Sequence, residues 1–537
     1  MKTNPNMTSL IRRVCLVAAG SLLLASCARE VGESYDDFER MALEAWITQH
    51  RPDLAGNLQE EGGYYVDVLD AGDPDRSPVG EEACWVHYDF SGRNLGGDIV
   101  LTRDASEAVL EGTFTKYTRY VPLYRYCSDK GYQGTGLLEG SYLAMRNTLT
   151  LSEAYFEKYR TDASRRLTSR EVRLREGSRV VLYMPSRVVG SSGVEGSGGY
   201  EGQYALDARR PMIVTMAIRD TVKNPLKVEG DEVDAFCEGN GGLRVYLKEE
   251  DKEASGASRA GDSESAIPSD PASPDHPYNV AERWVSACDT IPQLYVNYGY
   301  RPSETLTFPK PYASGYEPYK TESSVAAIDR RIAEALEKRF HADGDAYPSI
   351  RELGADSVKL DGKAKIWYIG RFLDGFIFDT NIDEVKEIIY GEVLKEGKAL
   401  EYTPKDNRES NISAFYYVVP HLQFGQWAAF ITTSTNAYGS SGRTGTTNTS
   451  SSGGSSSSSY LDYLNYMNYM NSYYGSGGYY GNYYGNYYGN YLGGYYNPYY
   501  GSSYDNSSEG TTTTKTVSTE IPAFAPLIFQ LYIEPKQ

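Results

Sequence analysis

Histidine and cysteine are scarce in this sequence, which has only 5 and 6 of them among 537 residues. None of them recurs at the short spacings by which proteins bind zinc or other transition metals. We therefore expect no metal centre, and any chemistry has to come from ordinary polar and aromatic side chains.

Positive charge is also in short supply. Lys and Arg total 53 against 72 Asp and Glu, so the formal net charge is −19 and the sequence pI is about 4.9. A chain of this sign is repelled by phosphate backbones, and nucleic acid is therefore excluded as a partner.

Long apolar runs are confined to the N-terminus. Three basic residues precede an apolar stretch at 14–24, which is too short to span a bilayer comfortably. It ends in Leu-Ala-Ser-Cys at 24–27, which resembles a bacterial lipobox, where the cysteine is lipidated and becomes the new N-terminus. We expect a signal peptide at 1–26 and an acylated Cys27 that anchors the chain in the cell envelope, at the outer membrane. A plain secretory signal with an incidental cysteine is the alternative.

Removal of this signal takes away three positive charges, so the net charge falls from −19 to −22. Four cysteines remain beyond Cys27. An exported protein can form disulfides, and local pairing would join Cys84 to Cys127 and Cys237 to Cys288. Free buried thiols are equally compatible with the sequence, because connectivity cannot be deduced from spacing.

Two segments have too little aliphatic content to form a core. Residues 249–276 are rich in charged residues, Ser, Ala and Pro, and we expect a disordered linker there. Residues 441–518 begin as Ser, Thr and Gly and then become rich in Tyr and Gly. Three interpretations of this insert are open: a solvated, disordered loop, an aromatic surface for peptides or glycans, or a self-associating segment.

Apolar periodicity predicts two helices, at 36–50 and 324–340, the first with Ser34 and Asp37 as a capping pair. A β-hairpin is predicted at 366–380. Its aromatic and aliphatic residues alternate up to an Asp-Gly turn at 374–375, the strongest short signal for a hairpin. The second strand ends in Phe-Asp at 378–379, an aromatic ring beside a carboxylate.

Three motifs, in this order, resemble the FKBP-type peptidyl-prolyl cis-trans isomerases. The hairpin carries Tyr-x-Gly at 368–370 and then Phe-Asp. Gly-Gln-Trp-Ala at 425–428 precedes Ala-Tyr-Gly at 437–439, and Ile-Pro at 521–522 precedes Leu-Ile-Phe at 527–529. Each motif alone is weak, and their order makes the resemblance specific.

The resemblance implies an α+β fold in which a curved antiparallel sheet wraps around one short helix, placed here at 412–422. It also implies a hydrophobic pocket between sheet and helix that isomerises X-Pro bonds without a cofactor. The polar groups of this pocket would be Tyr368, Asp379 and Tyr438. The residues that contact the substrate would be Phe378, Leu400, Tyr402, Ile412, Phe415, Ile521 and Phe529.

Within that pocket the Ile412 N–H and the Tyr438 hydroxyl would hold substrate carbonyls. The chain departs from the family pattern at Asn411, which replaces an aliphatic residue, and at Ala523, which replaces a second proline. The tyrosine-rich insert also interrupts a loop that overhangs the pocket in the family.

Residues 61–222 resemble a second, degenerate copy. Residues 90–102 align without gaps on 368–380, and 177–190 resemble 425–439. Phe90 stands in place of Tyr368, and Val-Leu at 100–101 in place of Phe-Asp. Since the polar pocket groups are missing, we expect a fold copy without isomerase activity.

The predicted order along the chain is therefore a signal peptide, an N-terminal anchor and helix at 27–60, the degenerate FKBP-like domain at 61–222, a linker with a helical segment at 223–355, and the isomerase domain at 356–537. Proline-containing exported polypeptides are the expected partners. The alternative is a non-catalytic FKBP-like chaperone or binding lipoprotein whose tyrosine-rich loop contacts peptides, glycans or partner proteins. Oligomeric state and natural client stay open.

Overall fold

A computed structural model of the chain describes residues 34–112, 114–132, 135, 137–189, 211–247, 267–268, 270, 272–312, 325–340, 357–408, 411–443, 445–451 and 513–536. The predicted signal peptide and Cys27 lie outside these residues. Most of the predicted linker at 249–276 and most of the insert at 441–518 lie outside them as well.

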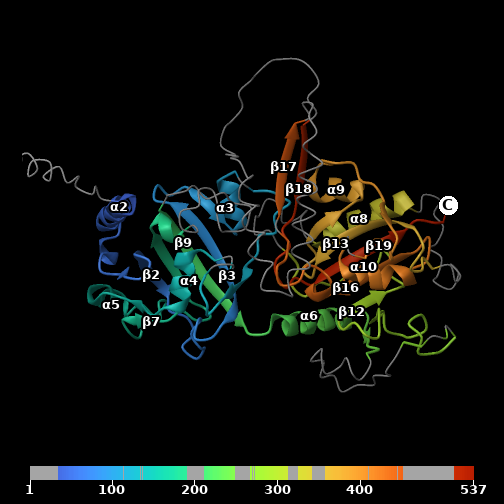
Figure 1. The fold of residues 1–537 in the computed structure, drawn as a ribbon, viewed down its shortest axis with the longest axis horizontal. Coiled ribbons are helices and arrows are strands. Elements are labelled where there is room, and N and C mark those ends of the chain that lie inside the picture. Colours follow the sequence, from blue (N-terminus) through green and yellow to red (C-terminus); the bar gives the residue numbers. More distant parts are fainter. Residues whose placement is uncertain are drawn as a thin grey trace, which may run out of the picture.

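The fold is α+β, as the sequence predicts, and two large sheets form two halves that lie side by side (Figure 1). The N-terminal sheet has 7 strands in the order β1-β2-β8-β9-β3-β4, with β5 on β3. These strands are β1 (Leu58–Gln59), β2 (Tyr64–Asp70), β3 (Cys84–Asn94), β4 (Ile99–Thr102), β5 (Leu123–Cys127), β8 (Arg179–Met184) and β9 (Met212–Val222).

The C-terminal sheet has 8 strands in the order β10-β11-β12-β16-β19-β13-β14, with β15 on β13. All its pairs are antiparallel except β10 with β11. The strands are β10 (Leu243–Arg244), β11 (Trp284–Ser286), β12 (Leu294–Asn297), β13 (Ala364–Phe372), β14 (Ile377–Thr380), β15 (Leu400–Tyr402), β16 (Trp427–Thr432) and β19 (Leu527–Ile533).

Two short ladders lie outside these sheets. The first joins β6 (Leu149–Thr150) to β7 (Glu171–Val172). The second joins β17 (Thr446–Ser451) to β18 (Thr513–Ser518), and it projects from the junction between the halves (Figure 1).

The helices of the N-terminal half are α2 (Tyr35–His50), η1 (Pro52–Leu54), α3 (Ala105–Leu110), α4 (Glu139–Arg146), α5 (Glu153–Tyr159) and η2 (Ser186–Val188). Those of the C-terminal half are α6 (Pro225–Gly239), α8 (Val325–Phe340), α9 (Asp383–Tyr390), α10 (Ser413–Val418), η4 (Val419–His421) and η5 (Ser434–Asn436).

One strand order occurs twice. The order β2-β8-β9-β3-β4 in the first sheet repeats as β12-β16-β19-β13-β14 in the second, and each copy adds one short strand to its long central strand. The hairpins also share their register, because β3 and β13 both shift between a glycine and an arginine, at Gly92/Arg93 and Gly370/Arg371. Each half thus contains an antiparallel sheet with one short helix, α4 or α10, packed against it.

Several local predictions are confirmed. Helix α2 begins at a capping box formed by Ser34 and Asp37, and α8 covers the predicted 324–340 segment. Strands β13 and β14 form the predicted hairpin, with Gly375 at a φ of +87° in its turn. The helix predicted at 412–422 is α10 followed by the 3-10 turn η4.

The second sheet begins earlier than the predicted domain start at residue 356. Strand β12 lies in the block that the sequence assigned to a linker and helical segment, yet it pairs with β16 from Leu294↔Thr432 to Asn297↔Ala429. All 4 residues of β12 are buried, so this strand is part of the core. The domain boundary at 356 is therefore corrected to include β10, β11 and β12.

Both faces of the C-terminal sheet are covered. Alternate residues of β19 enter two different clusters: Phe529 and Leu531 face α10, while Ile528 and Tyr532 face α6 and α8. All 7 residues of β19 are buried, whereas β9 alternates between buried and more exposed residues. Strands that are buried on both faces read as continuous apolar runs.

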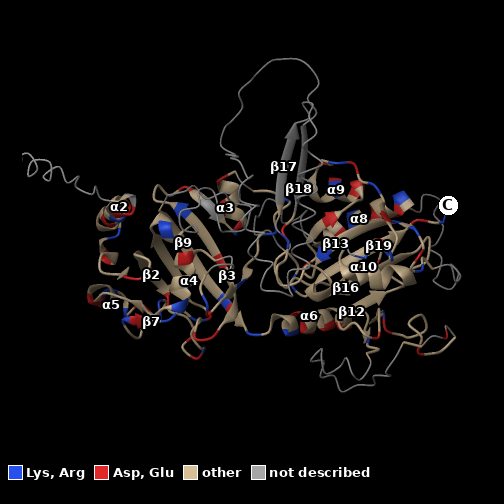
Figure 2. Ribbon diagram, in the orientation of Figure 1, with Lys and Arg blue, Asp and Glu red and all other residues tan. Residues whose placement is uncertain are grey.

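Charged residues of both signs are mixed over the helices and loops, while the strands of the C-terminal sheet carry few of them (Figure 2). Among the residues described, no helix combines the length and the apolar character needed to cross a membrane.

Candidate functional site

The polar end of the candidate site is a tyrosine–carboxylate pair on neighbouring strands. The Tyr368 hydroxyl donates to Asp379 Oδ2 at 3.1 Å. The backbone of Tyr368 is fixed on both sides, because its N–H donates to Asn381 Oδ1 at 2.8 Å and its carbonyl accepts from Thr380 Oγ1 at 2.7 Å. Burial and the nearby Asp379 carboxylate both raise the pKa of Tyr368, so its hydroxyl stays protonated and remains a donor.

A glycine lets the next residue of the site take its place. A Cβ built on Gly370 would come within 2.6 Å of the Phe378 ring. The family-like Tyr-x-Gly motif therefore has a packing reason here: the missing side chain leaves room for the Phe378 ring to lie over β13.

Aromatic rings from six elements form the floor of the site. Phe415 of α10 lies at its centre, with ring centroids 5.3 Å from Phe529, 5.4 Å from Phe430 and 5.9 Å from Tyr402. Phe378 and Tyr368 reach Phe529 at 5.7 and 6.2 Å. Edge-to-face contacts dominate, as expected for packed rings. Phe378, Phe415 and Phe529 are only 3–4% exposed, so the rings cover one another in this conformation.

Tyr438 is positioned by the turn η5 just before it. The buried Glu229 of α6 accepts from both the N–H and the hydroxyl of Ser434, each at 2.6 Å, and so anchors the start of η5. Burial raises the pKa of Glu229 to about 7. Tyr438 itself is half-buried, and Arg443 lies over its ring, with the guanidinium carbon 5.3 Å from the centroid and Nη1 3.5 Å from the hydroxyl.

The two ends of the interrupted loop are tied together beside the site. Arg443 and Ile521 exchange backbone hydrogen bonds of 2.7 and 2.8 Å, and the β17–β18 ladder begins just beyond this bridge. Ile521 is buried against the aromatic floor. The insert therefore begins and ends at the Arg443–Ile521 bridge, which we call the neck of the insert. The backbone hydrogen bonds of the short loop near Tyr438 form on the other side of this neck.

Three of the predicted contact residues differ in their exposure and hydrogen bonding. The Ile412 N–H has no hydrogen-bond partner within the part of the chain that the structure describes, which suits the predicted role as a donor to a substrate carbonyl. Tyr402 is 1% exposed, and its buried hydroxyl also lacks a partner there, so it lies in the interior beside Phe415. Leu400 is half-buried on the neighbouring edge strand, opposite Ile366.

The structure therefore brings the predicted set into one region: Tyr368, Phe378, Asp379, Tyr402, Ile412, Phe415, Tyr438, Ile521 and Phe529 all belong to or adjoin one core cluster. Sequence reasoning missed Arg443 and Glu229. Arg443 could have been noticed in the sequence, because no other Lys, Arg, Asp or Glu occurs between Glu409 and Asp462. Nothing in the local sequence ties Glu229 to Ser434, because the two are far apart along the chain.

The N-terminal half places different residues at the matching positions. Strand register puts Phe90 at the position of Tyr368, Leu182 at that of Phe430 and Val214 at that of Phe529. The helix that follows Leu138, as α10 follows Ile412, has Ser141 at the position of Phe415. Three ring positions of the C-terminal half are thus occupied by aliphatic or small residues, and Phe90 keeps a ring without the hydroxyl of Tyr368.

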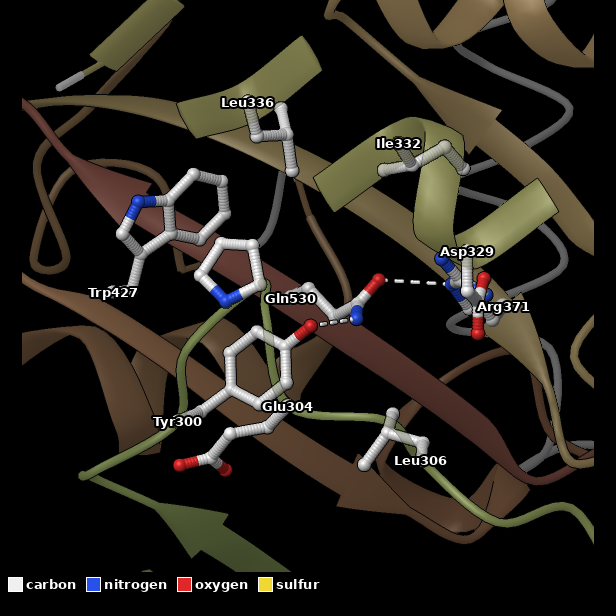
Figure 3. A pocket seen from close by; sticks show the side chains of 10 residues that line it. Tyr300, Glu304, Leu306, Asp329, Ile332, Leu336, Arg371, Trp427 and Gln530 are labelled. Carbon is white, nitrogen blue, oxygen red and sulfur yellow. Dashed lines mark hydrogen bonds and ion pairs between the residues drawn. The ribbon is translucent and has the colours of Figure 1, made fainter. Parts of the chain in front are cut away.

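A separate narrow cavity lies on the opposite face of the C-terminal sheet, under α8 (Figure 3). Four of its polar side chains bond to one another: Arg371 donates to Gln530 at 2.8 Å and pairs with Asp329, while Gln530 bonds to Tyr300. The buried indole N–H of Trp427, which also lines the cavity, has no partner among the described residues. No predicted site residue lines it. Among the described residues, no three His, Cys, Asp or Glu side chains gather in a way that would hold a metal ion.

Comparisons with known proteins find no matching family profile and no matching curated sequence. Solved structures that resemble the chain include FkpA from Escherichia coli, at 10% identity and a TM-score of 0.21 over 41% of this chain and 75% of that one. The three FKBP domains of wheat FKBP73 match at 10% identity and a TM-score of 0.18 over 89% and 95% of the two chains.

A peptidyl-prolyl cis-trans isomerase from Pseudomonas syringae pv. tomato matches at 13% identity and a TM-score of 0.20, over 36% of this chain and 98% of that one. Matches at such low identity and TM-score do not show which activity the chain has. The case for a function therefore rests on the geometry of the site.

Proposed function

We propose that the C-terminal half is an FKBP-like peptidyl-prolyl cis-trans isomerase. One observation carries the proposal: residues from β13, β14, α10 and β19, which are far apart in sequence, converge on one aromatic site with a Tyr368–Asp379 pair at its edge. The site offers apolar walls and a few directed hydrogen-bond donors.

These residues fit the requirements of prolyl isomerisation. Rotation about an X-Pro bond costs roughly 18–20 kcal/mol because the amide loses its resonance on twisting. An aromatic cup formed by Phe378, Phe415 and Phe529 would favour the twisted amide, which is less polar than the planar one. The catalyst needs no covalent step, since it acts by binding the transition state more tightly than the ground state.

The polar groups would orient the peptide. The free Ile412 N–H would donate to one carbonyl of the substrate, and the Tyr438 hydroxyl to another. Asp379 holds the Tyr368 hydroxyl at the rim, and Arg443 lies against Tyr438. Each removed donor would cost roughly 1–3 kcal/mol of transition-state binding.

The N-terminal half would be a catalytically silent copy. Its strand order matches, but Phe90 has no hydroxyl, and Ser141 stands where Phe415 closes the floor. We propose that it supports the active half rather than turning over substrate itself.

The location and clients belong to the same proposal. A lipidated Cys27 would tether the chain to the outer membrane of the cell envelope, where exported polypeptides with proline bonds would be its substrates. Incorporation of labelled fatty acid into the wild-type chain, and its absence in Cys27→Ser, would test this anchoring.

A non-catalytic binding module is the second candidate, and one observation favours it. The rings of Phe378, Phe415 and Phe529 are only 3–4% exposed, so the site has to open before a proline ring can enter. In that case the fold would grip peptides without accelerating their isomerisation.

A protease-coupled assay on the full chain with Xaa-Pro peptides separates the two candidates. Isomerisation above the uncatalysed rate, reduced about tenfold or more in Asp379→Ala, would support the enzyme. Peptide binding that persists in Asp379→Ala and Tyr438→Phe, with no rate acceleration in either chain, would support the binding module instead. Glu387→Ala, which removes an exposed carboxylate from the nearby helix α9, is the matched control.

A further inference from the structure

We propose that the N-terminal half acts as a positioning partner: it docks on the loop that carries Tyr438 and sets the rim of the candidate pocket through Tyr117 and Thr519. This inference rests on the proposed function of the C-terminal half. It assigns a task to the half that lacks the pocket residues.

The docking is specific, because buried charges meet across the junction. Arg103 of the N-terminal half pairs with Glu520 at 3.0 Å, with the two side chains only 3% and 14% exposed. Arg119 pairs with Asp374 of the hairpin turn at 2.8 Å, and its guanidinium lies 4.4 Å above the Phe372 ring. Breaking such a pair would leave an uncompensated charge in a dry contact, which is strongly unfavourable.

An apolar contact fixes the other side of the same loop. Trp85 of β3 meets Phe524 edge-to-face, with ring centroids 4.4 Å apart. Glu520 and Phe524 flank Ile521, whose backbone is bonded to Arg443. The N-terminal half therefore holds the segment 519–524 on both sides of the Arg443–Ile521 bridge.

A chain of hydrogen bonds runs from this contact into the site. Thr519 Oγ1 donates to the carbonyl of Tyr117 at 2.7 Å. The carbonyl of Thr519 accepts from Arg443 Nη2 at 3.3 Å, and Arg443 Nη1 lies 3.5 Å from the Tyr438 hydroxyl. Thr519 is 1% exposed, so water does not compete for the hydrogen bonds made by Thr519 itself.

The ring of Tyr117 contacts a second element next to the site, helix α9. It stacks on Tyr390, the last residue of α9, with centroids 4.0 Å apart and an interplanar angle of 19°. Burial and the charge of Asp379 both raise the pKa of Tyr390, so Tyr390 lies within the electrostatic reach of the polar pair of the site. One residue of the N-terminal half thus contacts both rim elements, α9 by its ring and the Tyr438 loop through its carbonyl.

Positioning makes a distinct kinetic prediction. Tyr438 would bind a substrate carbonyl in the ground state and in the transition state alike, and loss of such uniform binding raises KM and leaves kcat near its original value. Tyr117→Ala removes the stacked ring, and Thr519→Val removes the hydroxyl. We expect each to raise KM for an Xaa-Pro peptide roughly 3- to 10-fold. Tyr117→Phe and Thr519→Ser keep the ring and the hydroxyl, and both should restore the original KM.

Hydrogen exchange tests the same inference without any activity. The amides of Arg443 and Ile521 are bonded to each other in the bridge, and both should exchange faster in Tyr117→Ala and Thr519→Val than in the conservative variants. Unchanged KM and unchanged exchange in the two disruptive variants would overturn the proposal. If Asp379→Ala loses activity while these variants do not change, only the positioning role fails. If the wild-type chain shows no activity at all, the proposed function fails and the exchange rates alone decide whether Tyr117 orders the loop.

Discussion

Two buried glutamates, one in each half, make the same contact. Glu39 of α2 accepts from the N–H and hydroxyl of Ser186 at 2.8 and 2.6 Å, as Glu229 of α6 does from Ser434. In each case the serine opens a 3-10 turn that follows the strand next to the sheet centre. The helix before each sheet is thereby linked to the loop after β8 or β16, and in the C-terminal half that loop carries Tyr438.

The pKa of Glu229 gives this contact a predictable pH dependence. The carboxyl has a pKa of about 7 in the folded chain, against 4.5 as its ordinary value, because burial disfavours the charge. The folded state therefore holds a proton that the unfolded state has released between these two pH values. The contribution of Glu229 to stability is fully present below pH 4.5 and is lost as the pH rises through about 7.

Glu229→Gln should remove that dependence. The expected loss in the wild-type chain is on the order of 3 kcal/mol between pH 4.5 and 8, and the variant should show a flatter profile of urea midpoint against pH. Glu387→Gln, an exposed carboxylate of α9, is the control and should leave the slope as it is. Equal slopes in the wild-type chain and Glu229→Gln would show that this carboxyl does not titrate with folding.

Strand pairing, at the scale of elements, places two cysteines opposite each other. Cys84 of β3 and Cys127 of β5 are direct partners in an antiparallel pair, and both are buried and free in the structure. Cys237 is buried in a different core cluster, and Cys288 is half-buried next to Thr290. The pairing of Cys84 with Cys127 stays a prediction, and the register of β3 and β5 favours it.

We expect a Cys84–Cys127 disulfide in protein folded under oxidising conditions. Closing this loop would stabilise the N-terminal half by about 4 kcal/mol in the chain-entropy account. Burial raises the pKa of Cys84, and that of Cys127 to about 12, so little thiolate is present once the strands are paired and oxidation should precede complete folding. Intact mass and thiol titration without reductant check this, with Cys237→Ser as the control. Four titratable thiols beyond Cys27 would contradict it.

The neck of the insert is a second feature at this scale. The Arg443–Ile521 bridge and the β17–β18 ladder close the loop before the residues beyond Ser451 begin. The contacts of Tyr438 do not depend on those residues.

Replacing residues 452–512 by a short turn should therefore leave the thermal midpoint nearly unchanged, because no described contact of the aromatic floor is lost. The isomerisation rate should be retained as well. If the insert instead binds client proteins, the shortened chain should bind an unfolded protein less tightly, while its rate of peptide isomerisation should stay the same. A drop in thermal midpoint of many degrees would contradict the closed-neck account, and it would be measured by differential scanning calorimetry.

Local patterns predicted local structure well. The hairpin at β13–β14 and the capped helix α2 follow from turn chemistry and capping that lie within a few residues, whereas the short helix α10 was placed by the family resemblance. The pairing of β12 with β16 could not be predicted in this way, because β16 lies far along the chain. The same reason hid Glu229 and Tyr117, whose partners are distant in sequence, whereas Arg443 lies only five residues from Tyr438 and had a signal in the sequence.

At the scale of the whole molecule, the two halves share one strand order but contribute different residues to the candidate site. The C-terminal sheet is covered on both faces and holds the ring cluster, while the N-terminal half lacks those rings and contributes charged and aromatic contacts to the loop near Tyr438. A site that converges from several elements is a better basis for a function than any of its motifs alone.

The measurement that tests this account most directly is the exchange rate between cis and trans forms of an Xaa-Pro peptide, followed by NMR in the presence of the full chain. The account predicts catalysed exchange by the wild-type chain and a loss of about tenfold or more in kcat/KM for Tyr368→Phe and for Asp379→Asn. Since the two groups act as one hydrogen-bonded pair, the double variant should lose little beyond either single change. Exchange no faster than that of the free peptide, or equal exchange in all four chains, would contradict it.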